Sequence, residues 1–338
     1  MIRAYAALAA LGLALLTHPA GAFQEEPLIP LGPVFVRNAS PTGIAVPYPV
    51  METARCEDAF GLHASYSSTI MLANSPVGHP AGAWDVNVDM ETAVLDLSVS
   101  ATVDAWGVEL SVLVPMVSYR AGFLDSPINS WHDLLGLEDY DYGRSTRPEN
   151  QFLFEVKRDG LLVMDGVEGE WGLGDVRVGV KKSIVARPEA SMSISAVVEV
   201  PSGDAAHGYG NGSPDLFIAA LADLKASETL WVYLNGGLVV PGDLKGAATT
   251  VDLTTMLYAG AEVRWIFLGQ YALAGQFMAA SSPYDTGIDA LDGLSTLASV
   301  ALEYHPTVRS SIHAAFTEDP TTTNAPDVGA SVGYAYRF

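Results

Sequence analysis

Two serine–histidine pairs carry the residue types that could support nucleophilic chemistry. His63 lies two positions before Ser65, and Ser311 lies two positions before His313. On a β-strand the members of each pair share a side but stand about 6.5–7 Å apart, whereas a histidine that activates a serine needs a hydrogen bond of about 2.6–3.2 Å. No Gly-x-Ser-x-Gly elbow or third orienting residue accompanies them. A lipid hydrolase or acyltransferase is therefore only an alternative hypothesis for the function of this chain.

Charged side chains form a second set, because they recur at alternate positions within otherwise apolar segments. They would line a polar interior, where opposite charges either pair and hold the lumen narrow or mark a solute path with a constriction. The candidates are Asp96, Glu109, Arg177, Lys181, Glu199, Asp215, Glu262, Arg264 and Glu303, with His63 and His313.

Metal and cofactor chemistry find little support. His132-Asp133 and the scatter Asp285, Asp289 and Asp292 lack the ligand spacing of a zinc site or a calcium loop. We expect no metal and no cofactor. Acidic loops would either stay solvated or bind divalent cations that bridge lipopolysaccharide phosphates.

The elements that must position these residues are β-strands, because apolar and polar side chains alternate with a period of two. The pattern predicts an all-β fold, a transmembrane antiparallel β-barrel of about twelve strands. The predicted strands are Phe60–Leu72, Val86–Val103, Trp106–Tyr119, Asp175–Ile184, Met192–Val200, Asp215–Leu224, Leu230–Val240, Leu257–Leu268, Tyr271–Ala280, Leu294–Tyr304, Arg309–Glu318 and Val328–Phe338. Within the second strand the apolar phase reverses, which predicts a bulge or a break near Glu91-Thr92.

Connection lengths give an independent indication of a membrane barrel. Short and long connections alternate along the whole chain, as expected for periplasmic turns and long extracellular loops. Gln151–Arg158 and Leu161–Asp165 are also β-like and are interpreted as a hairpin above the membrane. If both entered the bilayer, the barrel would have fourteen strands.

The last predicted strand is apolar and aromatic on one face. Tyr334, Tyr336 and Phe338 lie on that face, and the pattern resembles the C-terminal strand of outer-membrane barrels. We expect it to contact the barrel-insertion machinery. Aromatic residues near other strand ends (Trp84, Trp106, Tyr119, Trp171, Trp231 and Trp265) are interpreted as interfacial girdles.

Composition and the N-terminus agree with this compartment. Arg3, the apolar run Ala4–Leu16 and the site Ala20-Gly21-Ala22 predict a secretory signal peptide over residues 1–22, with an anchoring helix as the alternative. Hydrophobic residues make up 49% of the chain, yet no later stretch is long enough for a transmembrane helix. The formal charge of −22 disfavours nucleic acid as a partner. A single cysteine, Cys56, allows no intramolecular disulfide.

Two segments lie outside the predicted barrel of residues 60–338. Residues 23–59 are rich in proline and form either a plug in the lumen or a periplasmic tail. Residues 120–174 form a long extracellular loop or lid. Within it Ile128, Trp131 and Leu135 follow a predicted helix start at Ser126, and that helix would either cover the barrel mouth or pack on its own hairpin.

The long loop carries a resemblance to a known family. Its residues resemble the loop signature of a family of uncharacterised proteobacterial outer-membrane proteins, a domain of unknown function. The resemblance implies a barrel in the outer membrane of a Gram-negative bacterium, with no activity and no catalytic residues. The matching residues are Gly122-Phe123-Leu124-Asp125, Ile128, Trp131-His132-Asp133, Gly136-Leu137, Arg144 and Arg147-Pro148-Glu149-Asn150, with Gly172–Asp175 opening the next strand.

Taken together, these patterns predict a porin-like barrel in contact with outer-membrane lipid and lipopolysaccharide, with a channel or binding site for a small solute. A non-conducting structural or surface protein is a further alternative.

Overall fold

The computed structural model describes residues 28–338, apart from 104–105, 129, 131–147 and 322. The predicted signal peptide, Trp131 and Leu135 lie outside the described residues. No helix in the described part of the chain has the length and apolar character needed to cross a bilayer.

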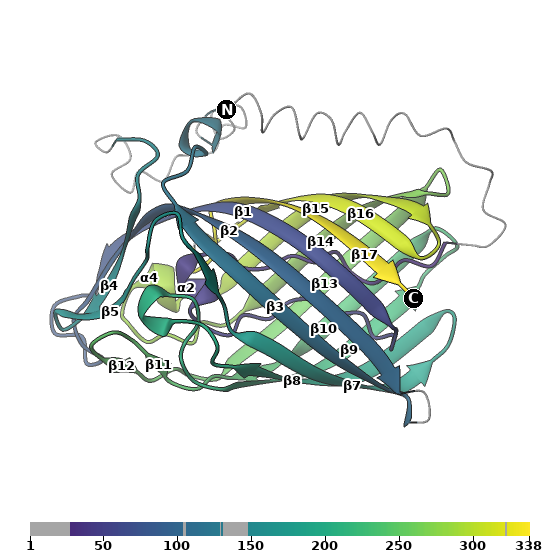
Figure 1. Ribbon diagram of the computed structural model, residues 1–338, viewed down its shortest axis with the longest axis horizontal. Coiled ribbons are helices and arrows are strands. Elements are labelled where there is room, and N and C mark those ends of the chain that lie inside the picture. Colours follow the sequence, from purple (N-terminus) through teal and green to yellow (C-terminus); the bar gives the residue numbers. More distant parts are fainter. Residues whose placement is uncertain (1–27, 104–105, 129, 131–147, 322) are drawn as a thin grey trace.

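Twelve antiparallel strands close into a barrel within the described residues (Figure 1). Strand β1 pairs with both β2 and β17, so the sheet has no open edge in the bilayer. The predicted twelve-stranded barrel is confirmed. Its strands are β1 (Ala59–Asn74), β2 (Trp84–Val103), β3 (Val108–Arg120), β7 (Val176–Ala186), β8 (Ala190–Val200), β9 (Asp215–Lys225), β10 (Leu230–Val240), β13 (Met256–Phe267), β14 (Tyr271–Ala280), β15 (Ser295–Thr307), β16 (Ser310–Glu318) and β17 (Val328–Arg337).

The outer wall is apolar because one side chain in two points away from the lumen. These outward residues are large and aliphatic or aromatic on every side of the barrel, and they would face lipid. Examples are Leu62, Leu97, Leu110, Val180, Ile194, Ile218, Leu234, Val263, Leu273, Val300, Phe316 and Tyr334. A closed barrel with such a surface is an outer-membrane protein of a Gram-negative bacterium.

Connections alternate in length as the sequence predicts. At one end the strands join through 104–107, 187–189, 226–229, 268–270 and 308–309, and at the other through 75–83, 121–175, 201–214, 241–255, 281–294 and 319–327. The long connections gather at the left end of Figure 1 and the short turns at the right. We take the long-loop end as extracellular.

Strand β2 is continuous from Trp84 to Val103, so the bulge or break predicted near Glu91-Thr92 is wrong. Its pairing with β1 runs without a register shift over all of β1, from Ala59 opposite Ser100 to Asn74 opposite Asp85. The apolar phase reverses because the environment changes: β2 continues beyond the lipid, where its inward side chains form a protein core. There Val86 and Val88 are buried.

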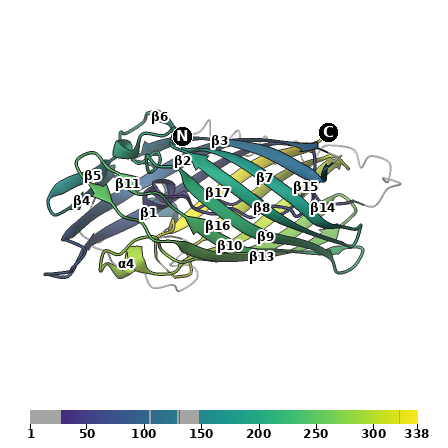
Figure 2. The same ribbon diagram turned by 90° about the horizontal axis from the view of Figure 1, so that it is seen from below.

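An outer cap covers the extracellular end (Figure 2). Strand β4 (Leu153–Arg158) pairs with the extension of β2, and β5 (Leu161–Asp165) pairs with β4. Neither joins the wall, so the fourteen-stranded alternative is wrong. The remaining cap elements are η3 (Ala205–His207), β11 (Leu244–Lys245), β12 (Thr250–Val251) and α4 (Asp289–Asp292). The short strand β6 (Trp171–Leu173) pairs with β3, beyond the part of β3 that pairs with β7.

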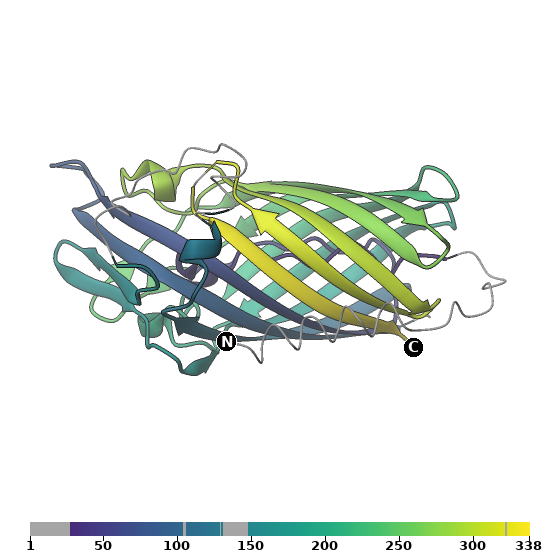
Figure 3. The ribbon, with the colours of Figure 1, turned by 90° about the horizontal axis from the view of Figure 1, so that it is seen from above.

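Residues 28–58, here called the luminal segment, run inside the barrel and include the short helix α2 (Pro41–Ile44) (Figures 1 and 3). Two hydrophobic cores result. One joins the luminal segment to β9, β10 and β13–β16. The other joins α2 and its neighbours to the outer cap.

The girdle interpretation fails for three aromatic residues. Trp84, Tyr119 and Trp231 are at most 4% exposed and belong to these cores. Trp106, Trp171 and Trp265 are about half exposed or more, as a girdle requires.

Candidate functional site

The ascending limb of the luminal segment is tied to the wall through its backbone and one arginine. The amide of Val34 donates to Oε2 of Glu262 at 2.7 Å, and its carbonyl accepts from Gln276 at 2.8 Å. Arg37 forms an ion pair with Asp96 on β2, with 3.0 Å between Nη2 and Oδ1. The limb therefore bridges opposite sides of the lumen.

The tip of the segment turns at α2, where the sequence Ser40-Pro41 suits a helix start. The Ser40 hydroxyl accepts from the amide of Gly43 at 3.0 Å. Thr42 then donates to Asn324 at 2.7 Å, and its carbonyl accepts from Tyr284 at 3.0 Å. These contacts attach the tip to two extracellular loops.

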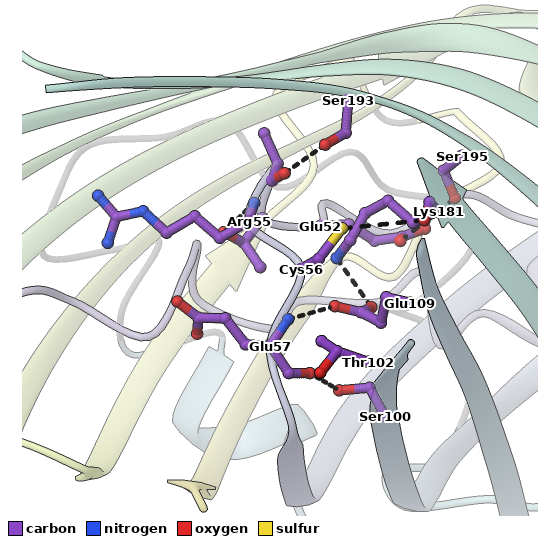
Figure 4. Close-up of polar contacts among 12 residues, drawn as sticks. Glu52, Arg55, Cys56, Glu57, Ser100, Thr102, Glu109, Lys181, Ser193 and Ser195 are labelled. Atoms are coloured by element: carbon purple, nitrogen blue, oxygen red, sulfur yellow. Dashed lines mark hydrogen bonds and ion pairs between the residues drawn. The ribbon is translucent and has the colours of Figure 1, made fainter. Parts of the chain in front are cut away.

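The descending limb is held by inward polar side chains of the wall (Figure 4). Asn235 bonds both the amide and the carbonyl of Glu52, at 2.7 and 3.0 Å. Asp223 accepts from Thr53 and from the amide of Ala54, at 2.5 and 2.9 Å. Closer to the periplasmic end Glu109 accepts from the amide of Glu57 at 2.8 Å. The backbone polar groups of this limb thus find partners without forming a strand.

One side of the lumen holds a buried charge cluster. Arg264 donates to Glu262 at 2.7 Å and lies 3.0 Å from Glu303. Nε2 of His305 lies 3.2 Å from the same Glu303 oxygen, and the guanidinium sits 5.3 Å from the ring centre of Tyr233. These groups fill the space between β10, β13 and β15.

The opposite side holds two further ion pairs. Lys181 on β7 lies 2.8 Å from Glu109 on β3, and Arg177 lies 3.2 Å from Glu199 on β8. Arg177 also donates to the carbonyl of Tyr48 at 2.8 Å. Eight of the nine charged residues proposed for the lumen are thus buried and ion-paired. Six of them pair with one another, Asp96 pairs with Arg37, and Glu303 shares Arg264 with Glu262. Asp215 bonds instead to Asn211 and the amide of Gly242.

The two histidines proposed for the lumen come together. His63 on β1 and His313 on β16 both lie opposite Gly333 of β17, and their rings stack with 5.4 Å between centres. Phe35 of the luminal segment stacks on His63 at 4.4 Å. Nδ1 of His63 and Nε2 of His313 have no hydrogen-bond partner in the described residues. The two histidine rings therefore contact each other, and neither His63 with Ser65 nor His313 with Ser311 forms a hydrogen bond in the described residues.

A cavity of about 230 Å³ separates the luminal segment from the wall of β1–β3 and β7–β9. The wall there carries small side chains, so a twelve-stranded interior, wider than side chains can fill, keeps free space. The small lining residues are Gly61, Ser98, Ser100, Ser111, Ser195 and Ala219. The apolar lining includes Leu31, Pro33, Phe35, Pro49, Val50, Met51, Phe60, Val197, Phe217 and Tyr258. The charged lining residues are Glu52, Glu109, Arg177 and Lys181.

Part of the long loop packs on the outer wall of the barrel. Residues 125–128 are helical and Ile128 is buried. The Phe123 ring stacks on Tyr66, an outward residue of β1, at 5.5 Å. The amides of Phe123 and Leu124 donate to Glu91. Whether Ile128, Trp131 and Leu135 act together as a lid stays a prediction, because the last two lie outside the described residues.

The extracellular loops are organised by buried carboxylates. Asp175, between β6 and β7, accepts from the amides of Ser202, Gly203 and Asn211 at 2.7–3.1 Å. Burial raises the pKa of the Asp175 carboxyl to about 6, with the charge of Glu199 adding and the amides opposing. Within the described residues, no three His, Cys, Asp or Glu side chains are grouped to hold a metal ion.

Sequence reasoning missed the partners supplied by the luminal segment. Arg37 and Glu52 stand in a proline-rich stretch without strand periodicity, so alternation could not assign them a side. Their signal is composition: a few charges within an otherwise apolar segment.

Comparison with one solved structure supports the fold, and two further matches have lower TM-scores. The COG4313 outer membrane channel from Pseudomonas putida F1 superposes with a TM-score of 0.54 at 14% identity, over 84% of this chain and 96% of that one. The NanC porin gives a TM-score of 0.46 at 11% identity, over 82% of this chain and 100% of that one. The KdgM porin in complex with disordered oligogalacturonate gives 0.43 at 10% identity, over 83% and 99%. No curated protein matches the sequence.

A family model described as a protein of unknown function, DUF3187, matches residues 82–338. This range contains eleven of the twelve wall strands and the long loop whose residues carry the resemblance noted above. The chain therefore belongs to the DUF3187 family.

Proposed function

We propose that this protein binds a small solute in its lumen and passes it across the outer membrane, and that the luminal segment and the outer cap close the path in the state described here. The cavity between the luminal segment and the wall carries the proposal. It lies inside a closed barrel, and it is lined by a chain segment that belongs to no wall strand.

The attachment of the luminal segment suits a movable closure. It is held by hydrogen bonds, ion pairs and apolar contacts, while the barrel is complete without it because β1 begins only at Ala59. Several anchors are single side chains, such as Asp223 and Asn235. Removing them should loosen the segment and leave the wall strands intact.

Single-channel recording in planar bilayers tests the proposal. We expect rare, small openings from the full chain. Asp223→Ala combined with Asn235→Ala should raise the open probability at least several-fold, and deletion of residues 28–57 should give a steady conductance. A variant with a short turn in place of residues 151–166 tests the outer cap. Altered migration of unheated protein on gels and a β-type circular dichroism spectrum control for folding. Silence from all folded variants would overturn the channel.

A non-conducting structural protein is the second candidate, favoured by the hydrophobic core that joins α2 to the outer cap. A non-conducting protein predicts no conductance from any of the folded variants. A hydrolase finds no support from the stacked histidines, and phospholipid hydrolysis lost in both His63→Ala and His313→Ala would contradict this assignment.

A further inference from the structure

The charges around the cavity do not balance. Lys181 is paired with Glu109 at 2.8 Å, and Arg177 is paired with Glu199 at 3.2 Å. The carboxylate of Glu52 has no cation within ion-pair distance among the described residues. Because Arg177 is paired with Glu199, which lies outside the cavity lining, the two lining cations face three acids in all, and Glu52 is the acid without a paired cation.

Glu52 faces the cavity. It is one of the lining residues, and its carboxylate has a single hydroxyl contact, Ser195 at 3.5 Å. Figure 4 shows it beside Lys181 and Ser195. An ionised Glu52 carries a desolvation cost that a bound cation would offset.

The rest of the cavity would accommodate an apolar body. Phe35, Met51 and Tyr258 contribute to a lining that is mostly apolar and aromatic. The Phe217 ring already faces a cation, the Arg177 guanidinium at 4.8 Å. The volume of about 230 Å³ compares with about 150 Å³ for an engineered apolar cavity that binds benzene. One compact molecule of that class fits.

We propose that this cavity is a binding site for a small organic cation: a protonated amine on a compact apolar body, with the ammonium group at Glu52 and the body against the aromatic lining. The inference rests on the proposed function and adds the solute class. Glu52 acts as counter-ion, and the Ser195 hydroxyl is placed to accept from the same ammonium.

Three probes that share one ring and differ in charge test the proposal: benzylammonium, benzyl alcohol and benzoate. Binding is measured by isothermal titration calorimetry on the full chain in detergent at pH 7. We expect benzylammonium to bind at least tenfold more tightly than benzyl alcohol, and benzoate to bind least. Glu52→Gln should remove the advantage of benzylammonium and leave benzyl alcohol unchanged, while Glu52→Asp should keep part of it.

Glu228→Gln is the matched control, because it removes one acid from an exposed turn where Glu228 pairs with Lys225. It should change none of the three affinities. Glu52→Gln should fold, since Asn235 holds the backbone of residue 52 and not its side chain. Equal or tighter binding of benzoate, an unchanged preference in Glu52→Gln, or no binding of any probe would overturn the inference. Binding of benzylammonium without any conductance would overturn only the proposed channel function, because calorimetry detects binding whether or not the solute crosses the barrel.

Discussion

At the scale of single residues, Arg264 shows how strongly the interior depends on charge pairing. Its side chain is 0% exposed and lies between Glu262 and Glu303. Arg264→Met would leave two buried carboxylates without their cation, so we expect a loss of about 3–5 kcal/mol in unfolding free energy. Urea unfolding in detergent, followed by tryptophan fluorescence, measures it.

Lys225→Met is the control for this prediction. Lys225 pairs with Glu228, whose side chain is 81% exposed, and such surface pairs contribute about 0–1 kcal/mol. Equal effects of the two substitutions would show that the Arg264 cluster is more hydrated than its burial indicates.

Gly333 is a second residue-scale test, because its missing side chain makes room for the histidine pair. A Cβ at this position would overlap both the His313 and the His63 rings. Gly333→Ala should therefore destabilise the barrel by about 1–3 kcal/mol, the usual cost of overpacking. Gly275→Ala, on β14, adds a Cβ with nothing within 4 Å and should be close to neutral. Adding His313→Ala to Gly333→Ala should recover part of the loss, and thermal unfolding of the three variants beside the unmodified protein measures these differences.

The sequence predicts which side chains point inward but not what they meet. Alternation along one strand assigned Asp96 to the lumen, because a strand has only two faces. It could not supply Arg37 as its partner, since the two residues belong to segments whose relative placement depends on the closed barrel. For the same reason His63 and His313 were assigned separately to the lumen, without their stacking.

At the scale of elements, periodicity located the strands because one face must be apolar over the width of the bilayer. The predicted bounds of β10 and β14, Leu230–Val240 and Tyr271–Ala280, agree with the structure at both ends. The rule fails where a strand leaves the lipid. Around Glu91 the apolar residues move to the inner face because the core of the outer cap replaces lipid as the apolar neighbour. Recognition of Tyr334, Tyr336 and Phe338 by the insertion machinery stays a prediction, which membrane fractionation of Phe338→Ala would test.

The loop of residues 201–214 should respond to pH through Asp175. Its pKa is about 6 in the structure, whereas an opened loop returns it toward the ordinary value of about 4. Protonation therefore favours the closed loop, and its stability rises as the pH falls from 7 toward 5, by about 1.4 kcal/mol per pH unit below pH 6. Hydrogen exchange at Ser202 and Gly203, corrected for intrinsic rates, should be up to about tenfold more protected at pH 5 than at pH 7.5.

Asp175→Asn serves as the control, because it keeps an acceptor and removes the titration. Its loop should show equal corrected protection at both pH values. Weaker protection of the unmodified loop at pH 5 would mean that the three amides lower the pKa more than burial raises it.

At the scale of the whole molecule, the barrel wall encloses the luminal segment, which forms none of the wall strands. The sequence predicts the wall because every strand repeats the same two-faced pattern. The sequence does not decide whether the luminal segment is a plug in the lumen or a periplasmic tail. Its proline-rich backbone has no periodicity, because its polar groups are satisfied by scattered side chains of the wall such as Asn235 and Asp223. Such partners are visible only once the barrel is closed.

The net negative charge of the molecule predicts the ion selectivity of any conductance, because the ion pairs inside the barrel do not neutralise that charge. The formal charge is −22, while the luminal cations Arg37, Arg177, Lys181 and Arg264 are all paired with acids. The field at the mouths should therefore concentrate cations. Any conductance of the chain, opened by deletion of residues 28–57 if necessary, should be cation-selective in a KCl gradient, with a reversal potential of the cation sign. The selectivity should weaken near 1 M salt, where the screening length falls to about 3 Å. An anion-selective current at low salt would show that the paired interior, and not the acidic surface, sets the potential along the path.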